Sequence, residues 1–398
     1  MIRVIALTLA LAGCGGGGGG EDHEPTPIPT ASATGTAVPT ETPLPSPTAT
    51  PVPAFDEIVL AVATRYGDVL GNGAREYAQF VLRYEAGAWE SVPLRLQEPA
   101  GVFGVTFASA QIAYAYGTRG EGSGGLLLRS IDAGRTWQNL SDRLPAEPDQ
   151  IFDAAFLDEH TGYVVGRGYF TQPTVLRTTD GGFSWRAVTI PELTGFPLFG
   201  SYALGFRADA VELVRYDAGG LVVVRLNDPA AQPTVLALAG DTSFAGGNAF
   251  STTRSKGWIA EANGASILSS DAPGAPWTPL ITESSVVRFL NAIDVRDDLA
   301  GVAGGADGSS GTYEPLLLTS DDGVAWQPAA VGVVVDGQIV DVLRLRGDAA
   351  LAIVNGFDLD PTSLVLGSAD AGRTWQHEPT PFERDWQIHD LARNTERD

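Results

Sequence analysis

Cysteine and histidine are scarce in this 398-residue sequence, which contains one Cys and four His. A single Cys excludes an internal disulfide and leaves no thiolate pair for a zinc site. The four His, at positions 23, 160, 377 and 389, are far apart and show no spacing of metal ligands. A G-x-S-x-G nucleophile turn and a P-loop pattern are also absent from the sequence. The residues therefore predict no catalytic motif, no cofactor and no metal.

Positive charge is in deficit as well. The chain has 25 Lys and Arg against 48 Asp and Glu, which gives a formal net charge of −23. A field of this sign repels phosphate groups and anionic lipid surfaces. The composition therefore predicts no nucleic-acid partner.

The N-terminal residues have the pattern of an export signal. Arg3 provides a positive start, residues 4–10 are apolar apart from one Thr, and Leu11-Ala12-Gly13-Cys14 follows. The apolar run is too short to span a bilayer. The last four residues resemble the bacterial lipobox, which implies a lipoprotein signal peptide over 1–13 and lipidation of Cys14. The alternative is a chance match after a plain signal peptide.

Residues 14–54 have the composition of a disordered linker. Six consecutive Gly follow Cys14, and residues 25–53 are rich in Pro, Thr and Ser. Neither stretch can bury enough apolar area to offset the entropy lost on ordering. We therefore expect a tether that holds an exported domain at the bacterial cell envelope through the lipid anchor alone. The residue after Cys14 is Gly15 and not Asp. In a cell with two membranes, the absence of Asp at this position implies sorting to the outer membrane.

An internal repeat begins beyond residue 55. The octapeptide Ser130-Ile131-Asp132-Ala133-Gly134-Arg135-Thr136-Trp137 recurs almost unchanged at 368–375. Close variants occupy 178–185 and 319–326, and a copy with one inserted residue occupies 269–277. The Asp residues of successive copies lie 48 to 50 positions apart, except for one interval of 91. This regularity indicates a repeat protein.

Two further turns complete the series. The interval of 91 is nearly two periods, which points to a decayed turn near 227–228. Upstream, residues 85–89 resemble the octapeptide shortened by one residue. The spacing therefore predicts seven turns.

Each part of the octapeptide has a task in a tight hairpin. The Asp carboxylate accepts backbone N–H groups, the Gly supplies a positive φ, and the Ser or Thr hydroxyl adds a local bond. The Trp buries its ring against a neighbouring unit. We interpret the motif as a folding device, with a catalytic or calcium-binding role for its Asp as the alternative. The residues assigned to this structural role are Asp132, Gly134, Trp137, Asp180, Gly182, Trp185, Asp271, Trp277, Asp321, Gly323, Trp326, Asp370, Gly372 and Trp375.

Each period reads as four strands, for example 152–157, 162–166, 174–178 and 184–190, and the repeat joins the third to the fourth. Four-stranded units of this length are the blades of a β-propeller. The first unit lacks its first strand, whereas residues 386–392 form an unused strand at the other end. We therefore predict an all-β, seven-bladed propeller over 55–398, closed by the C-terminal strand.

The octapeptide resembles the Asp box, also called the bacterial neuraminidase (BNR) repeat. Propellers of this sialidase-like superfamily include sialidases, xyloglucan-degrading glycosidases, sortilin-type receptors and photosystem II assembly or stability proteins. A single seven-bladed ring looks most like the assembly-factor type. Sialidases have six blades and an Arg-Ile-Pro motif that is absent here, and the xyloglucan enzymes have two propellers. The resemblance implies the architecture and leaves function open.

The candidate site lies where long loops follow the second strands. Loops on a rigid scaffold often carry function. Three consecutive units end the second strand with an arginine, and a basic cluster on an acidic protein favours a carboxylate or phosphate group. Alternatively, each arginine pairs with a local acid such as Asp68 or Glu121. The predicted binding residues are Arg65, Tyr66, Arg119, Arg167 and Tyr169.

Two functions remain open at this point. The first is a monomeric, non-enzymatic binding or assembly module that recognises a protein or peptide through the loop face. The second is a carbohydrate-binding or diverged glycosidase propeller. The second function would place opposed carboxylates beside stacked aromatic residues on that face.

Overall fold

The structure is a computed structural model. It describes residues 57–69, 75–96, 100–120, 124–146, 148–167, 173–190, 201–207, 210–217, 220–226, 234–237, 247–253, 255–261, 265–272, 275–281, 288–357, 362–382 and 385–394. All of them belong to one compact unit, Ala49–Asp398. The predicted signal peptide and linker lie outside these residues. Within the described part, no helix has the length and apolar character needed to cross a membrane.

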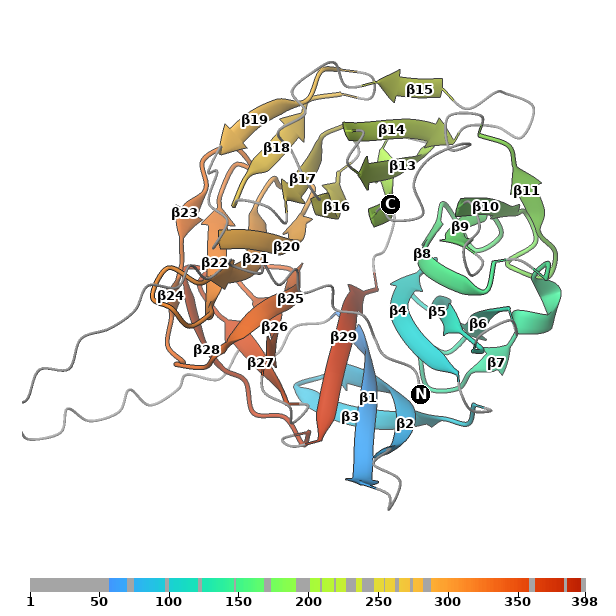
Figure 1. The fold of residues 1–398 in the computed structure, drawn as a ribbon, viewed down its shortest axis with the longest axis horizontal. Coiled ribbons are helices and arrows are strands. Elements are labelled where there is room, and N and C mark those ends of the chain that lie inside the picture. The colour runs from blue at the N-terminus through green and yellow to red at the C-terminus, as the bar shows by residue number, and fades with distance from the viewer. Residues whose placement is uncertain are drawn as a thin grey trace, which may run out of the picture. The chain divides into compact units, whose positions relative to one another are not determined.

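The described residues form strands and one short 3-10 helix, η1 (Ser141–Arg143), and the architecture is a β-propeller (Figure 1). Four of its sheets have four antiparallel strands each. The first contains β29 (Trp386–Arg393), β1 (Val59–Val69), β2 (Arg75–Glu85) and β3 (Ala88–Leu94). The others contain β12 (Ser201–Arg207), β13 (Ala210–Asp217), β14 (Gly220–Leu226) and β15 (Thr234–Ala237); β16 (Gly247–Thr252), β17 (Gly257–Glu261), β18 (Ile267–Ser270) and β19 (Thr278–Ile281); and β20 (Arg288–Val295), β21 (Gly301–Asp307), β22 (Glu314–Ser320) and β23 (Gln327–Pro328).

Two sheets are larger. A five-stranded sheet contains β25 (Gly337–Arg344), β26 (Ala350–Gly356), β27 (Ser363–Ser368) and β28 (Thr374–His377), with β24 (Ala330–Val331) added parallel to β28. An eight-stranded sheet contains β4 (Gly101–Phe107), β5 (Ala113–Thr118), β6 (Gly125–Ser130), β7 (Gln138–Asn139), β8 (Gln150–Phe156), β9 (Gly162–Arg167), β10 (Pro173–Thr178) and β11 (Arg186–Val188). One pair, Thr118 with Gln150, joins its two groups of four strands.

The number of separate blades differs from the prediction. Five sheets each contain one blade of four antiparallel strands, whereas the eight-stranded sheet is continuous, so five separate blades are present instead of seven. The joining pair forms because the segment before β8 is held against the first group. The Thr118 hydroxyl donates to the Asp149 carbonyl over 2.9 Å, and the Gly125 N–H donates to the Pro148 carbonyl over 2.7 Å.

The first strand of each group of four contacts the first strand of the next group. These contacts follow the order β29, β4, β8, β12, β16, β20 and β25, and β25 in turn contacts β29. The hydrophobic cores lie between neighbouring groups, since each large cluster draws its side chains from two of them. The fold is therefore stabilised by packing between adjacent groups around a closed cycle.

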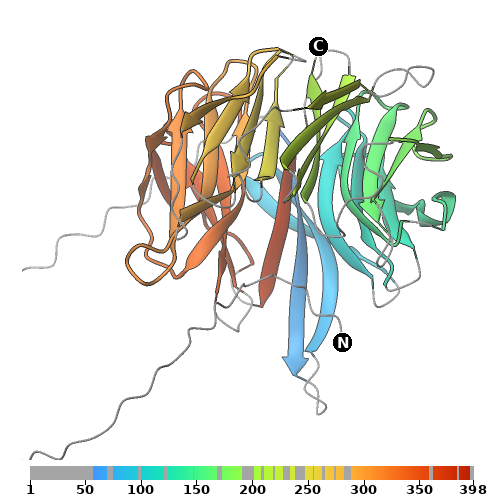
Figure 2. The same ribbon diagram turned by 45° about the horizontal axis from the view of Figure 1, so that its top comes forward.

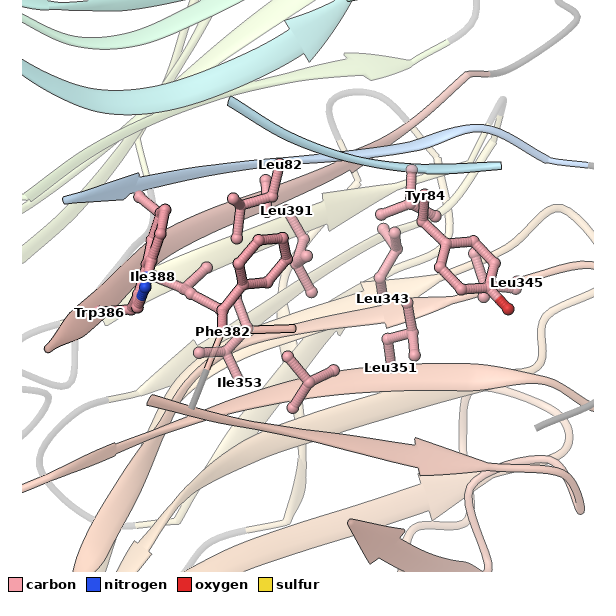
Figure 3. Close-up of a cluster of buried hydrophobic side chains, with 14 of the residues drawn as sticks. Leu82, Tyr84, Leu343, Leu345, Leu351, Ile353, Phe382, Trp386, Ile388 and Leu391 are labelled. Atoms are coloured by element: carbon pink, nitrogen blue, oxygen red, sulfur yellow. The ribbon is translucent and has the colours of Figure 1, made fainter. Parts of the chain in front are cut away.

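The C-terminal strand closes this cycle, as predicted. β29 pairs antiparallel with β1 from Trp386 opposite Arg65 to Arg393 opposite Val59. The two strands lie side by side in Figure 1, and Figure 2 shows them from another side. Behind them, Trp386, Ile388 and Leu391 pack with side chains of β2, β25 and β26 in the cluster drawn in Figure 3. This apolar layer fixes β29 to both of its neighbours.

The repeated turns join third to fourth strands, and three of them share one hydrogen-bond pattern. Asp132 accepts the Thr136 N–H over 2.8 Å, and the Ser130 hydroxyl accepts the Gly134 N–H over 2.8 Å. Gly134 has φ 88°, and a Cβ there would lie 2.5 Å from Leu60 of the preceding sheet. Glycine is therefore required both by the backbone and by the packing. The turns around Asp180 and Asp370 repeat these bonds.

Two copies depart from the predicted assignment. Their third strands end at Ser270 and Ser320, which places Asp271 and Asp321 one position too early to close the turn. Asp322 accepts the N–H groups of the two residues before Trp326, whereas Asp321 pairs with Arg373 over 2.6 Å. Asp271 pairs with Lys256 over 3.1 Å. The assignment fails because Thr319, taken as the first residue of the motif, instead donates its hydroxyl to the Ala371 carbonyl of the next turn.

Each of the five repeated turns accepts a hydrogen bond from a side chain of the preceding group of four strands. In every case a side-chain donor reaches a backbone carbonyl of the turn that follows, over 2.7 to 3.1 Å. The donor types differ, so this device has no sequence signature. The pairs are Arg83 with Ala133, Tyr114 with Gly181, Arg207 with Ser270, Trp258 with Gly323, and Thr319 with Ala371.

Deletion of residues 385–398 should abolish the cooperative thermal transition, because it exposes the edge of β1 and the cluster of Figure 3. Deletion of residues 395–398, which spares β29, is the matched control and should melt like the full chain. A synthetic peptide spanning 385–394 should restore the transition when added to the shorter chain. A full-length melting temperature without that peptide would contradict the closure.

Candidate functional site

Arg65 lies inside β1, opposite Ala78 of β2 and Trp386 of β29. The prediction that the strand ends at Arg65 is wrong, because Arg65 and Tyr66 continue the pairing and β1 ends at Val69. The guanidinium lies over the Trp386 ring, 5.8 Å from its centroid. Arg65 is exposed, and no carboxylate among the described residues pairs with it. Its N–H donors remain available to a ligand.

Tyr66 is half-buried beside this arginine. Its hydroxyl donates to Gln387 Oε1 over 3.0 Å, and its backbone N–H donates to the Asp385 carbonyl over 2.7 Å. Both bonds go to the segment that begins β29. Tyr66 therefore fixes the strand that carries the Trp386 ring.

Arg167 ends β9, and its guanidinium lies 5.3 Å from the centroid of the Phe152 ring. The Phe152 ring is nearly parallel to that of Tyr202 on β12, with 6.4 Å between centroids and 7° between planes. The arginine, the Phe and the Tyr thus connect two groups of strands. Tyr169, predicted beside them, lies outside the described residues.

Arg119 follows β5 and is paired. Its guanidinium donates to the Asp142 carboxylate over 2.7 Å. The alternative interpretation, in which an arginine pairs with an acidic residue of the same chain, therefore applies to Arg119. Its partner is Asp142. Glu121 and the side chain of Asp68, the acids named from the sequence, lie outside the described residues.

The three arginines lie at the same end of their groups of strands, since Arg65, Arg167 and the residue before Arg119 each pair with the first residue of a first strand. Gln150 pairs with both Thr118 and Arg167, which brings Arg119 close to Arg167. We call Arg65, Arg119 and Arg167 the arginine edge. Aromatic rings support two of its three guanidinium groups, a geometry suited to a carboxylate or phosphate.

Three aspartates in the first strands were missed by the sequence reasoning. Asp153, Asp341 and Asp390 each directly follow a β-bulge, and each accepts a backbone N–H from the next first strand around the cycle. The donors are Leu204, Leu391 and Val105, over 2.7, 2.6 and 2.8 Å. The available signal was the recurring Gln-Ile-x-Asp at 150–153, 338–341 and 387–390.

These carboxyls hold protons to unusually high pH. Burial raises the pKa of Asp153 to about 6 and that of Asp341 to about 7, and burial with the Asp341 charge raises the pKa of Asp390 well above its usual range. Asp341 and Asp390 lie within hydrogen-bond reach of each other, so the charge of one opposes the ionisation of the other. Asp294 and Tyr116 face the same pair. The cluster is thus partly neutral near pH 7.

His389 directly precedes Asp390 on β29. Burial lowers its pKa to about 4, and Nε2 lies 2.9 Å from the Thr64 hydroxyl. The imidazole is therefore neutral near pH 7, so it does not offset the carboxylate charge.

This carboxyl pair does not match the geometry of glycoside hydrolysis. A direct hydrogen bond places the two groups closer than the roughly 5 Å that retaining enzymes use. Each also has an oxygen already engaged by a backbone N–H. In the described part of the chain, no group of three His, Cys, Asp or Glu is arranged to hold a metal ion. The cluster therefore fits a structural role.

Comparisons with known proteins identify the fold. No protein-family model and no curated protein matches the chain. A YCF48 structure from Cyanidioschyzon merolae has a TM-score of 0.53 and 21% identity, covering 75% of this chain and 90% of that one. A GH74 xyloglucanase from Xanthomonas campestris has a TM-score of 0.53 and 16% identity, covering 70% of this chain and 45% of that one. A YCF48 structure bound to a D1 peptide has a TM-score of 0.49 and 17% identity, covering 71% and 84%.

The two likenesses with a TM-score of 0.53 support a β-propeller fold and show nothing about function. All three identities are far too low to carry a shared activity. The xyloglucanase is also more than twice as long as the part that this chain covers. Function must therefore be argued from the residues of this chain.

Stability should fall as the pH rises from 6.5 to 8.5. The unfolded carboxyls ionise near pH 3.9, whereas the folded Asp341 and Asp390 keep protons to higher pH, so the folded state loses their contribution as they ionise. His389 is neutral in the folded state, whereas the unfolded imidazole is still about half protonated near pH 6.5, so it opposes this fall only at the lower end of the interval. Asp341→Asn keeps an acceptor for the Leu391 N–H and should flatten the profile.

Urea midpoints at pH 6.5, 7.5 and 8.5 measure this effect. Asp142→Asn, which removes an exposed carboxylate, is the control and should keep the wild-type slope. Parallel profiles for wild type and Asp341→Asn would show that the carboxyl pair does not hold its proton.

Proposed function

We propose that this protein is a non-enzymatic binding or assembly module that recognises a protein or peptide through the arginine edge and its adjoining loops. The observation that carries the proposal is Arg65, whose exposed guanidinium lies over Trp386 without a described carboxylate partner. A guanidinium against a ring keeps its in-plane N–H donors for bidentate bonds to a carboxylate. The chemistry selected is therefore an anionic group of the partner, such as an acidic side chain or a C-terminus.

The surroundings of Arg167 support a macromolecular partner. Phe152 and Tyr202 extend the surface from this arginine to the next group of strands. Arginine and aromatic residues are enriched where proteins bind proteins. Arg119 contributes less, because binding an anion would compete with its ion pair to Asp142.

The finer architecture is also a proposal. We infer seven blades, with the eight-stranded sheet divided at the single pair between Thr118 and Gln150. The closed cycle of seven first strands supports this division. We also infer that the turns around Asp132, Asp180 and Asp370 are Asp boxes, on the basis of their common hydrogen bonds.

The cellular location that fits this role is the outer face of a bacterial membrane. A lipid on Cys14 would hold the propeller at the envelope, and residues 15–54 are long enough to let its loop face reach partners near the membrane. The lipobox-like run before Cys14 supports this anchor.

Cys14→Ser should move the protein from the membrane fraction to the soluble exported fraction, because no other Cys can accept the lipid. Immunoblots of fractionated cells measure the change, and growth with a radiolabelled fatty acid tests the modification directly. Retention of the variant on membranes washed with high salt would remove the anchor from the proposal.

Arg65→Ala and Arg167→Ala should each weaken peptide capture about tenfold, which corresponds to about 1.4 kcal/mol. The probes are peptides from exported proteins of the source cell, each made with a free and an amidated C-terminus. Fluorescence anisotropy at low and high salt gives the affinities, and raised salt should weaken binding. Arg119→Ala removes a guanidinium that is paired with Asp142, and it is the control for Arg65→Ala with the smaller expected loss.

Unchanged binding by the Arg65 and Arg167 variants would exclude the arginine edge as the site. Release of products from xyloglucan or sialyllactose by the wild type would favour the glycosidase function instead. Thermal melts of each variant establish that the fold is intact.

A further inference from the structure

Three aromatic rings form a continuous surface on the groups of β20 and β25, at the same end of the strands as the arginine edge. The Phe289 and Tyr313 ring centroids lie 5.9 Å apart, and those of Tyr313 and Phe357 lie 5.1 Å apart. Tyr313 is 39% exposed and Phe357 is 46% exposed, among the largest exposures of apolar side chains in the described part. We call these three residues the aromatic shelf.

The shelf is held rigid by backbone bonds. The Tyr313 N–H donates to Asp336 Oδ1 over 3.2 Å, and the Gly337 N–H donates to the Tyr313 carbonyl over 2.9 Å. A Cβ at Gly308 would lie 2.7 Å from the Tyr313 ring, so the ring packs directly on this glycine. Because the rings are already positioned, a partner would lose little entropy in ordering them.

Several other aromatic rings among the described residues carry an arginine of their own chain. Arg129 lies 5.6 Å from the centroid of the exposed Phe183 ring, and Arg65 lies over Trp386. Among the residues that the structure describes, no Arg or Lys lies over Tyr313 or Phe357. The faces of the shelf rings are therefore not occupied by a cation of the described residues.

Carboxylates outnumber cations beside the shelf. Asp307 and Glu314 lie opposite each other on β21 and β22, and Asp336 bonds Tyr313. The only basic group that the described strands place beside them is Arg288, bound to Asp307 over 2.7 Å. Glu314 and Asp336, both exposed, are left to face a partner.

We propose that the aromatic shelf binds a lysine or arginine side chain from a basic segment of a partner protein. A cation over Tyr313 or Phe357 is attracted by the negative face of the aromatic ring. The carboxylates of Glu314 and Asp336 attract the same cation. The shelf lies on other groups of strands than the three arginines and selects the opposite charge, so the proposal stands whether or not the arginine edge binds a peptide. A neutral glycan could stack on the same rings, and it is the competing occupant that the test must separate.

The probe is a labelled heptapeptide that alternates glycine with arginine and lysine, measured by fluorescence anisotropy with the full exported domain. Wild type should bind it, and raised salt should weaken binding. Tyr313→Leu and Phe357→Leu, which keep apolar volume but remove the π face, should each weaken it about two- to fivefold. Phe183→Leu removes an exposed ring already occupied by Arg129 and should leave the affinity unchanged.

Two changes to the peptide probe test the proposal without any change to the protein. Replacing arginine and lysine in the peptide by citrulline and acetyl-lysine should abolish binding, and a matched glutamate peptide should not bind. Equal affinity of the neutral peptide, or wild-type affinity of both shelf variants, would overturn the proposal. Displacement of the basic peptide by cellohexaose, with direct binding of that sugar, would assign the shelf to a glycan instead.

Discussion

The antiparallel pairing of β29 with β1 is the interaction on which the rest of this structure depends. Without it, β1 would have an open edge and the apolar cluster of Trp386, Ile388 and Leu391 would face water. Asp341 bonds β29 from one side, and Asp390 of β29 bonds β4 on the other. The same strand therefore joins both neighbours by backbone pairing, apolar packing and carboxyl acceptors at once.

The geometry of the candidate site depends on the pairing of β29 with β1. Trp386, which supports the Arg65 guanidinium, belongs to β29, whereas Arg65 belongs to β1. The ring and the cation come from opposite ends of the chain and meet only when the cycle is complete. Tyr66 adds a bond to Gln387 that fixes the same junction.

The sequence predicted the closure because the first unit lacks a strand and residues 386–392 supply an unused one, and the turns because Ser, Asp and Gly have fixed tasks in a hairpin. It misplaced Asp271 and Asp321, since the end of a strand depends on which residues find partners across the sheet. It also missed the aromatic shelf, because Phe289, Tyr313 and Phe357 come from three separate segments that only tertiary packing brings together. The bond of Arg119 to Asp142 of η1 was missed for the same reason.

The bond between the Ile58 N–H and Asn394 joins residues 336 positions apart. A chain made from its N-terminus must therefore keep the first sheet unfinished until almost all of the rest has been synthesised, and contacts of such long range form slowly. Any product that stops early carries an open edge and unpacked aromatic residues, which proteases and chaperones readily bind. The last strand thus acts as a check on completeness: only a chain that has been made through to β29 can hide the surface that marks it as unfinished.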